Sequence, residues 1–310
     1  MSKVIVITGA GSGFGALAAR ALARSGHIVC AAMRNTTTRN AGRVAEAAAY
    51  AAGHGVDLRT AEPDVLSRES ADAAISAAVT EAGRLDVLLH GAGHMVTGPT
   101  EVFTPEEVAA VHDTDVLGTQ RVNRAALPQL RSRRRGLVVW MGSTSTRGGT
   151  PPCPAPRFAA KSASSASSAS SAKSFMDALA VSCAAESARF RIETTSGVPG
   201  SFTSVINHFV TGRRPADRSM VPDYEELCVG LMEQVSQRPA VPTPADADAD
   251  AAQVADAIVR LVDAEHGKRP RVHIDPGDDG SEAVSAVADR VRADFHGRIV
   301  LDDLLTPHAA

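Results

Sequence analysis

Three glycines near the start of the chain, Gly9, Gly13 and Gly15, have the spacing of a loop that holds phosphate groups. They follow the apolar run VIVIT and precede Ala-rich residues with helical spacing. Glycines permit a tight turn and a close approach of the backbone to a diphosphate, and the helix that follows offers free N–H groups and the positive end of its dipole. We predict a dinucleotide site here, with Ser12 and Phe14 as further binding residues.

The elements that would position this loop alternate along the chain. Strands are predicted near 4–8, 28–33, 56–60, 85–90, 137–141, 192–196 and 271–274, and helices near 13–25, 41–53, 67–82, 105–130, 173–189, 251–265 and 281–296. This order predicts right-handed crossovers and a Rossmann-type α/β fold, a doubly wound, mainly parallel seven-stranded sheet with helices on both faces. Ligands bind beyond the carboxyl ends of such strands, so the loops there should carry the chemistry.

Several of these loops together resemble the short-chain dehydrogenase/reductase family. The glycine loop reads Thr-Gly-x-x-x-Gly-x-Gly, and the other matching segments are Asp64-Val65, His90-Gly91-Ala92-Gly93, Asp115-Val116-Leu117-Gly118, Ser143 and Pro199-Gly200 with Thr203. The resemblance implies that Asp64, Val65, Gly91, Ala92, Gly93, Pro199, Gly200 and Thr203 join the glycine loop in binding a nicotinamide cofactor. It also implies that Ser143 polarises the substrate oxygen.

The choice of cofactor depends on the residue that ends the second strand. An acidic residue there would accept hydrogen bonds from the ribose hydroxyls and repel a 2′-phosphate, but this chain has Met33-Arg34. A guanidinium suits bidentate phosphate contact. The sequence therefore favours NADP(H) over NAD(H).

The family resembled here carries Tyr-x-x-x-Lys some dozen residues after the serine, and this chain departs from that pattern. Arg157 stands where the tyrosine is expected, Lys161 matches the lysine that holds the ribose, and Asp115 replaces the asparagine of a proton relay. A guanidinium donates hydrogen bonds but does not give up its proton, so Arg157 could supply only the electrostatic half of the tyrosine's role. Rescue by Tyr224 is an alternative.

A Ser/Ala run over residues 162–172 follows Lys161 and complicates the assignment of the lysine. An unbroken helix from 157 to 189 would be about 50 Å long and too long for the sheet, so the run should form a loop or the helix should restart at Lys173. Lys173 is then the second candidate, although Ala169, four positions earlier, offers no chemistry. We favour Lys161 and expect local disorder in the run.

Composition limits the other possibilities. The 310 residues carry a net charge of −3 and are 44% hydrophobic, with four widely spaced cysteines and no apolar run of membrane-spanning length. We expect a cytoplasmic protein with free thiols and no nucleic-acid or membrane partner. No metal site is predicted, because His90 and His94 lack a third ligand. We expect one domain over 1–310, in which 201–250 forms a substrate-covering segment and linker.

Three functional hypotheses remain open at this point. The first is an NADP(H)-dependent oxidoreductase acting on a small-molecule carbonyl or secondary alcohol, with Ser143, Arg157, Lys161 and Asp115 as catalytic residues. The second is a catalytically deficient, cofactor-binding protein that serves as a partner or nucleotide sensor. The third is a lyase or epimerase on the same fold. The resemblance also implies a homodimer or homotetramer paired through the helices at 105–130 and 173–189.

Overall fold

The computed structural model describes residues 1–93, 100–146, 167–200, 202, 216–217, 219–220, 222–223, 250–276 and 280–305. For residues 100 and 167–171 the backbone alone is described. Arg157, Lys161, Thr203 and Tyr224 lie outside these ranges, as does most of the segment 201–250. The predictions made for them therefore stay predictions.

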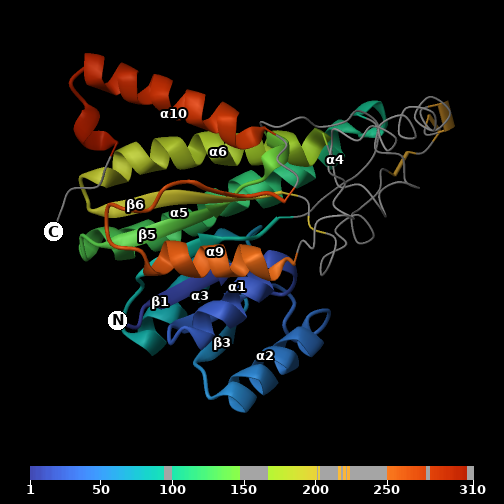
Figure 1. The fold of residues 1–310 in the computed structure, drawn as a ribbon. Helices are drawn as coiled ribbons and strands as arrows, with labels where there is room; N and C mark the ends of the chain where they lie inside the picture. The colour runs from blue at the N-terminus through green and yellow to red at the C-terminus, as the bar shows by residue number, and fades with distance from the viewer. Residues whose placement is uncertain are drawn as a thin grey trace.

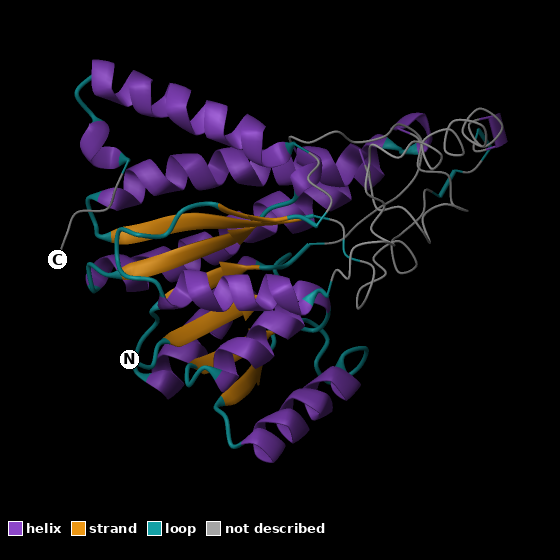
Figure 2. Ribbon diagram, in the orientation of Figure 1, coloured by secondary structure: helices purple, strands orange, loops and turns teal. Residues whose placement is uncertain are grey.

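The centre of the molecule is a seven-stranded sheet in which all neighbouring strands run parallel, in the order β3-β2-β1-β4-β5-β6-β7 (Figures 1 and 2). Its strands are β1 (Val4–Thr8), β2 (Ile28–Ala32), β3 (Leu58–Ala61), β4 (Val87–His90), β5 (Gly136–Met141), β6 (Ile192–Pro199) and β7 (Val272–Ile274). The chain order reverses between β1 and β4, which is where a ligand crevice forms in doubly wound sheets. The predicted fold class is confirmed.

Helices cover both faces of this sheet (Figure 1). They are α1 (Gly13–Arg24), α2 (Ala41–His54), α3 (Arg68–Ala82), α4 (Pro105–His112), α5 (Gly118–Ser132), α6 (Ser167–Ala188), α9 (Ala252–Asp263) and α10 (Ser281–Arg298). One apolar core joins α1, α2 and α9 to the sheet, and a second joins α3, α5 and α6 to its other face. The last helix, α10, lies outside α6 (Figure 1). No helix in the described ranges is long and apolar enough to cross a membrane.

The local sequence explains why the central strands form. All five residues of β1, VIVIT, and all six of β5, GLVVWM, are buried. Continuous apolar runs of this kind are typical of parallel strands with helices on both faces. The register aligns Thr8 with both Ala32 and His90, so the ends of β1, β2 and β4 stand level and their loops meet at one edge.

Two elements differ from the predicted boundaries. The expected single helix at 105–130 is interrupted by a π-helical turn, η2 (Asp113–Leu117), between α4 and α5. Hydrophobic spacing does not signal such a turn, which is often found at functional sites. Helix α6 begins at Ser167 instead of Lys173, so the last six residues of the Ser/Ala run are helical. The expected disorder is therefore wrong for these six residues, of which four are serines with only moderate helix propensity, and the extension is continuous with the packed part of α6.

Candidate functional site

The glycine loop between β1 and α1 is shaped so that no side chain fits at Gly9 or Gly15. Gly9 and Gly13 have φ values of +72° and +63°, which non-glycine residues rarely adopt. A Cβ on Gly9 would stand 2.5 Å from the carbonyl oxygen of Gly91, and one on Gly15 would stand 2.6 Å from that of Gly9. Helix α1 follows with no acidic residue in its first turn and no side-chain cap from Ser12. Its N–H groups can therefore receive a diphosphate, and the residues present fit the predicted dinucleotide.

Thr8 joins this loop to the loop that follows β4. Its hydroxyl oxygen accepts hydrogen bonds from the backbone N–H groups of Gly91 and Ala92, each at 3.2 Å. A Cβ on Gly91 would also stand 2.8 Å from the carbonyl oxygen of Thr8. The two loops are therefore packed backbone against backbone at the level where the order of strands reverses. Sequence reasoning identified Gly91 but missed Thr8.

The turn after β2 lies against the same glycine loop. A Cβ on Gly11 would stand 3.3 Å from the Cβ of Met33, which is buried. Arg34 is half-buried, and its carbonyl oxygen accepts a 2.6 Å hydrogen bond from the Asn40 side chain. Glu62, beyond β3, accepts a 3.2 Å hydrogen bond from the backbone N–H of Thr36 and another from its hydroxyl. No acidic residue follows β2 directly, while Glu62 is engaged by Thr36.

Asp64 and Val65, predicted to contact the adenine, form the turn between β3 and α3. The Asp64 carboxylate accepts a 3.0 Å hydrogen bond from the N–H of Leu66, and the N–H of Asp64 donates to the Ser70 hydroxyl at 2.8 Å. Val65 is buried against Gly118, where an added Cβ would stand 3.0 Å from the Val65 Cβ. This contact fixes the turn between β3 and α3 to the start of α5, directly after the π turn.

The side chains of Asp115 and Lys173 both approach Gly93, where the β4 loop faces the π turn and α6. Asp115 is fully buried, and its Oδ2 lies 3.2 Å from the point where a Cβ on Gly93 would stand. The Nζ atom of Lys173 lies 3.2 Å from that same point, and it donates a 3.2 Å hydrogen bond to the carbonyl oxygen of Met141. The structure therefore places Lys173, the second candidate for the lysine, in the crevice beside Asp115.

Ser143 follows β5 and is half-buried at the carboxyl edge of the sheet. Its hydroxyl lies 2.8 Å from that of Ser145 and accepts a 3.3 Å hydrogen bond from the Ser145 N–H. The Thr146 hydroxyl donates to the Ser143 carbonyl oxygen at 2.9 Å. This short 3₁₀ turn, η3 (Thr144–Thr146), fixes the Ser143 backbone. No sequence motif pointed to Ser145 as a partner of Ser143.

His90 occupies the last position of β4 and is completely buried. Its Nε2 donates a 2.7 Å hydrogen bond to the Asn123 side-chain oxygen in the neutral tautomer that this contact favours, and its ring centroid lies 4.7 Å from that of Trp140. Burial lowers the pKa of His90 to about 4, with the Lys173 charge adding to the shift and the Asn123 contact opposing it. His90 is therefore a neutral residue that ties β4 to α5. The described residues hold no cluster of three or more His, Cys, Asp or Glu that could bind a metal ion.

The last part of the crevice follows β6. The N–H of Gly200 donates a 2.8 Å hydrogen bond to the Ile274 carbonyl oxygen, and a Cβ on Gly200 would stand only 2.0 Å from a carboxylate oxygen of Asp275. Phe202 is buried with its ring edge-on to that of Phe14, at a centroid distance of 5.8 Å. Pro199-Gly200 thus leads the chain back over the first turn of α1.

Comparison with known proteins identifies the family that has this geometry. The family model for short chain dehydrogenase matches residues 3–214, from β1 past the end of β6. The chain belongs to the short-chain dehydrogenase family. This is a family of oxidoreductases that bind nicotinamide cofactors.

Two of the curated relatives match about half of this short-chain dehydrogenase. The 3-ketodihydrosphingosine reductase of Bacteroides thetaiotaomicron is 34% identical over 149 residues, 48% of this chain and 50% of the relative. The 17-beta-hydroxysteroid dehydrogenase type 1 of Homo sapiens is 38% identical over 151 residues, 48% of this chain and 45% of the relative. The chain thus spans about half the length of these curated relatives.

The crystal structure of a short-chain dehydrogenase from Streptomyces avermitilis is similar over nearly its whole length. It has a TM-score of 0.69 and 26% identity, with 97% of this chain and 98% of that chain covered. The likeness therefore extends past the residues of the family match, to the C-terminal part of the sheet and the helices around it.

Proposed function

We propose that this chain is an NADP(H)-dependent oxidoreductase that transfers hydride between the nicotinamide and a carbonyl or secondary alcohol substrate. The observation that carries this proposal is the alignment of two sites along one crevice. The first site is the cradle, by which we mean the close-packed backbone at Gly9, Gly15 and Gly91, where no side chain fits. The second site is at Gly93, two residues after Gly91 in the β4 loop, where the side chains of Asp115 and Lys173 approach. A dinucleotide bound by the cradle would extend its reactive ring towards that pair.

The preference for NADP(H) over NAD(H) rests on the turn after β2. Arg34 is half-buried there, with its backbone held by Asn40, so its guanidinium can reach a 2′-phosphate at little cost in ordering. The Glu62 carboxylate also reaches this turn, but it accepts hydrogen bonds from Thr36, which hold it away from the role of a ribose ligand. Both features support binding of the phosphorylated cofactor.

We propose that Lys173 provides the proton in this site. The cofactor would supply the hydride, so the chain must hold the substrate oxygen and deliver one proton to it in reduction. Lysine can act as a general acid, and Lys173 is anchored by the Met141 carbonyl oxygen beside the buried Asp115 carboxylate. Ser143 would hold the substrate oxygen. Arg157 remains a predicted source of positive charge at the position where the family has its tyrosine.

The substrate class that we propose is an apolar ketone or the corresponding secondary alcohol. The relatives include a reductase of 3-ketodihydrosphingosine and a dehydrogenase of 17-beta-hydroxysteroids, whose names describe ketone and alcohol groups on large apolar molecules. Their matches cover only half of this chain, so they support the reaction type more than the choice of substrate.

The test is NADPH oxidation with a panel of aliphatic and cyclic ketones, run on the full chain and on three variants. Lys173→Met should abolish turnover and Lys161→Met should leave it within a few-fold of the wild type. Arg157→Tyr should raise turnover if the tyrosine position faces the substrate. NADPH binding, measured by calorimetry without substrate, provides the second readout for each protein.

The combination of the two readouts separates the hypotheses. Binding of NADPH with no turnover on any ketone, in the wild type and in Arg157→Tyr, would refute the oxidoreductase and support a cofactor-binding partner or sensor. Product formation without a change in NADPH absorbance would indicate a lyase or epimerase. Absence of NADPH binding would refute the cofactor assignment itself.

A further inference from the structure

The helix α10 exposes a stripe of large apolar side chains. Val284, Val287, Val291 and Phe295 are 46%, 49%, 58% and 49% exposed. Their spacing of three, four and four residues places them along one side of the helix. Ile299 and Val300, which follow the helix, are 44% and 79% exposed and extend the apolar surface past its end. We call these six residues the α10 stripe.

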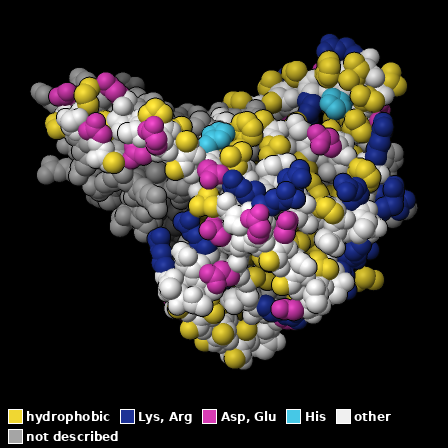
Figure 3. Space-filling model, turned by 180° about the vertical axis from the view of Figure 1, so that it is seen from behind, with side chains coloured by type: hydrophobic (Ala, Val, Ile, Leu, Met, Phe, Trp, Pro, Cys, Tyr) yellow, Lys and Arg dark blue, Asp and Glu magenta, His cyan; other side chains and the backbone are white. Residues whose placement is uncertain are grey.

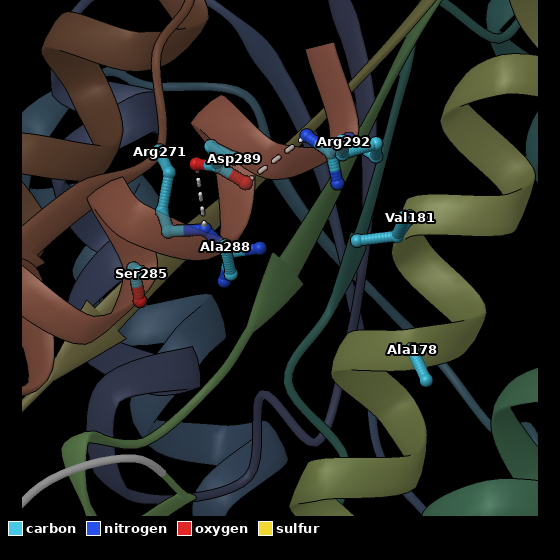
Figure 4. A pocket seen from close by; sticks show the side chains of 7 residues that line it. All are labelled: Ala178, Val181, Arg271, Ser285, Ala288, Asp289 and Arg292. Atoms are coloured by element: carbon cyan, nitrogen blue, oxygen red, sulfur yellow. Dashed lines mark hydrogen bonds and ion pairs between the residues drawn. The ribbon is translucent and has the colours of Figure 1, made fainter. Parts of the chain in front are cut away.

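The side of α10 that faces the protein body is small and polar instead. The buried residues of α10 are Ser281 and Ser285. The Ser281 hydroxyl forms a 3.1 Å hydrogen bond with Nδ1 of His273 on β7. Next to them, a cavity of about 280 Å³ separates α10 from α6 and is lined by Val181, Arg271, Ser285, Ala288, Asp289 and Arg292, among others (Figure 4). Arg292 pairs with Asp289 at 3.0 Å. The α10 stripe therefore does not pack against α6.

These polar contacts fix the rotation of α10 about its axis. Arg271, directly before β7, pairs with the buried Asp177 of α6, and its Nε lies 4.0 Å from a carboxylate oxygen of Asp289 on α10. Turning the stripe inward would break this network and bury valines against arginine and aspartate. The ion pairs of Arg271 with Asp177 of α6 and with Asp289 of α10 thus determine the outward orientation of the stripe.

The size of the stripe suits a protein interface. The exposed fractions correspond to roughly 500 Å² of apolar surface per chain, near the upper end for the largest patch on a monomer. In the rear view, hydrophobic side chains gather over the α10 end of the molecule (Figure 3). Two such patches in contact bury about 1,000 Å², which is the lower limit for a specific interface.

We propose that the α10 stripe is the surface through which two copies of this chain pair, α10 against α10 in antiparallel orientation. Val284, Val287 and Val291 have the three- and four-residue spacing of a coiled-coil seam, and Phe295 follows one turn later. Antiparallel pairing sets Val284 opposite Phe295 of the second copy and Val287 opposite Val291. It also opposes the two helix dipoles favourably. This surface differs from the pairing through residues 105–130 and 173–189 that the family resemblance implies, because α10 lies over the outer side of α6.

A membrane surface is the other occupant that an apolar helix side suggests, but the charges disfavour it. The helix has equal numbers of acidic and basic residues: Glu282, Asp289 and Asp294 against Arg290, Arg292 and Arg298. The whole chain has a net charge of −3. Helices that bind membrane surfaces are usually rich in basic residues, which attract anionic lipids. A helix with no net charge and a row of valines is therefore more compatible with pairing to a second copy of itself than with a membrane surface.

The test is sedimentation velocity of the full chain from about 1 to 200 µM, a range that brackets the affinity expected for so small an interface. The wild type should shift from monomer to dimer across this range. The double variant Val287→Glu/Val291→Glu should weaken the dimer at least about 100-fold, because it would bury unpaired carboxylates at the centre of the seam. The control is Ala286→Glu, which adds one carboxylate at an exposed position of α10 outside the stripe and should leave the dimer unchanged. Far-UV circular dichroism checks that all three proteins are folded.

Three results would overturn the proposal. The wild type could remain monomeric throughout the range. It could dimerise while the double variant dimerises equally well, which would place the interface elsewhere. Finally, a monomeric wild type could bind vesicles of phosphatidylcholine with phosphatidylserine while the double variant does not, which would assign the stripe to a lipid surface. NADPH binding is not involved in any of these readouts, so they are independent of the proposed function.

Discussion

Replacing Gly9 with alanine should be among the most damaging single-methyl changes in the cofactor site. The residue has φ of +72°, and an alanine in this left-handed region costs about 1–2 kcal/mol. The new Cβ would stand 2.5 Å from the Gly91 carbonyl oxygen and 2.7 Å from the Ala92 Cα. Both are backbone atoms held by Thr8, so they cannot rotate away, and such overpacking costs typically 1–3 kcal/mol more, or about 2–5 kcal/mol in all.

Two other glycines separate the backbone cost from the packing cost. Gly55 has φ of +63°, but a Cβ there meets nothing within 4 Å, so Gly55→Ala should cost about 1–2 kcal/mol. Gly53 lies in the last turn of α2 with open space around it and no positive φ, so Gly53→Ala should stabilise the protein by up to about 1 kcal/mol. The difference between the Gly9 and Gly55 variants is then the packing cost in the cradle.

Urea unfolding followed by circular dichroism measures these differences, and calorimetry measures NADPH binding. Gly9→Ala should lower the unfolding free energy by more than Gly55→Ala does and should also remove NADPH binding, because the cradle and Gly91 must move apart. The Gly53 and Gly55 variants should bind NADPH as the wild type does. The reasoning would be refuted if the Gly9 and Gly55 variants had equal stability, or if Gly9→Ala bound NADPH normally.

The remaining predictions concern charge. Lys173→Met should lower kcat at least about 100-fold, the typical contribution of a positioned acid, whereas Lys161→Met should change it little; equal losses would contradict the assignment to Lys173. Arg34→Asp should raise the Kd for NADPH at least about tenfold and that for NADH much less, as calorimetry with both cofactors can show, and a parallel loss would exclude the phosphate contact. Burial lowers the pKa of His90 to about 4, so between pH 6.5 and 4 the unfolded state takes up a proton that the folded state does not. The free energy of unfolding should therefore fall by about 3 kcal/mol as the pH decreases through this window. In urea titrations, His90→Asn should remove most of that loss. An unchanged pH dependence in this variant would place the titrating group elsewhere.

The strands and the phosphate loop could be predicted because each has a short-range signal. The run VIVIT and the glycines after it are adjacent in sequence, and buried parallel strands are continuously apolar. What the sequence could not indicate is which residues from other strands meet that loop. The bonds from Gly91 and Ala92 to Thr8 join positions about 80 residues apart, and nothing in either segment specifies the other.

The position of Lys173 shows the same limit, whereas Lys161 lies outside the described residues and stays a prediction. Both lysines have the correct residue type, and the four-residue spacing favoured Lys161 because it follows Arg157. The structure brings Lys173 to Gly93 through the direction of α6, a tertiary property that local spacing does not determine. The π turn that buries Asp115 and the bond between His90 and Asn123 were likewise outside the reach of periodicity.

The glycine cradle and the two side chains near Gly93, Asp115 and Lys173, belong to different elements of the fold, so substitutions affect them differently. The cradle is formed by backbone atoms of the β1 and β4 loops, so any change there alters packing and stability as well as binding. Asp115 and Lys173 are side chains from the π turn and α6, elements that do not form the glycine cradle. Cofactor binding is therefore constrained by the fold itself, whereas the means of proton transfer is open to substitution. Under the proposed assignment, Lys173 acts without a tyrosine one turn earlier, which is the kind of replacement that this separation permits, and the kinetics of Lys173→Met measure how much of the reaction depends on it.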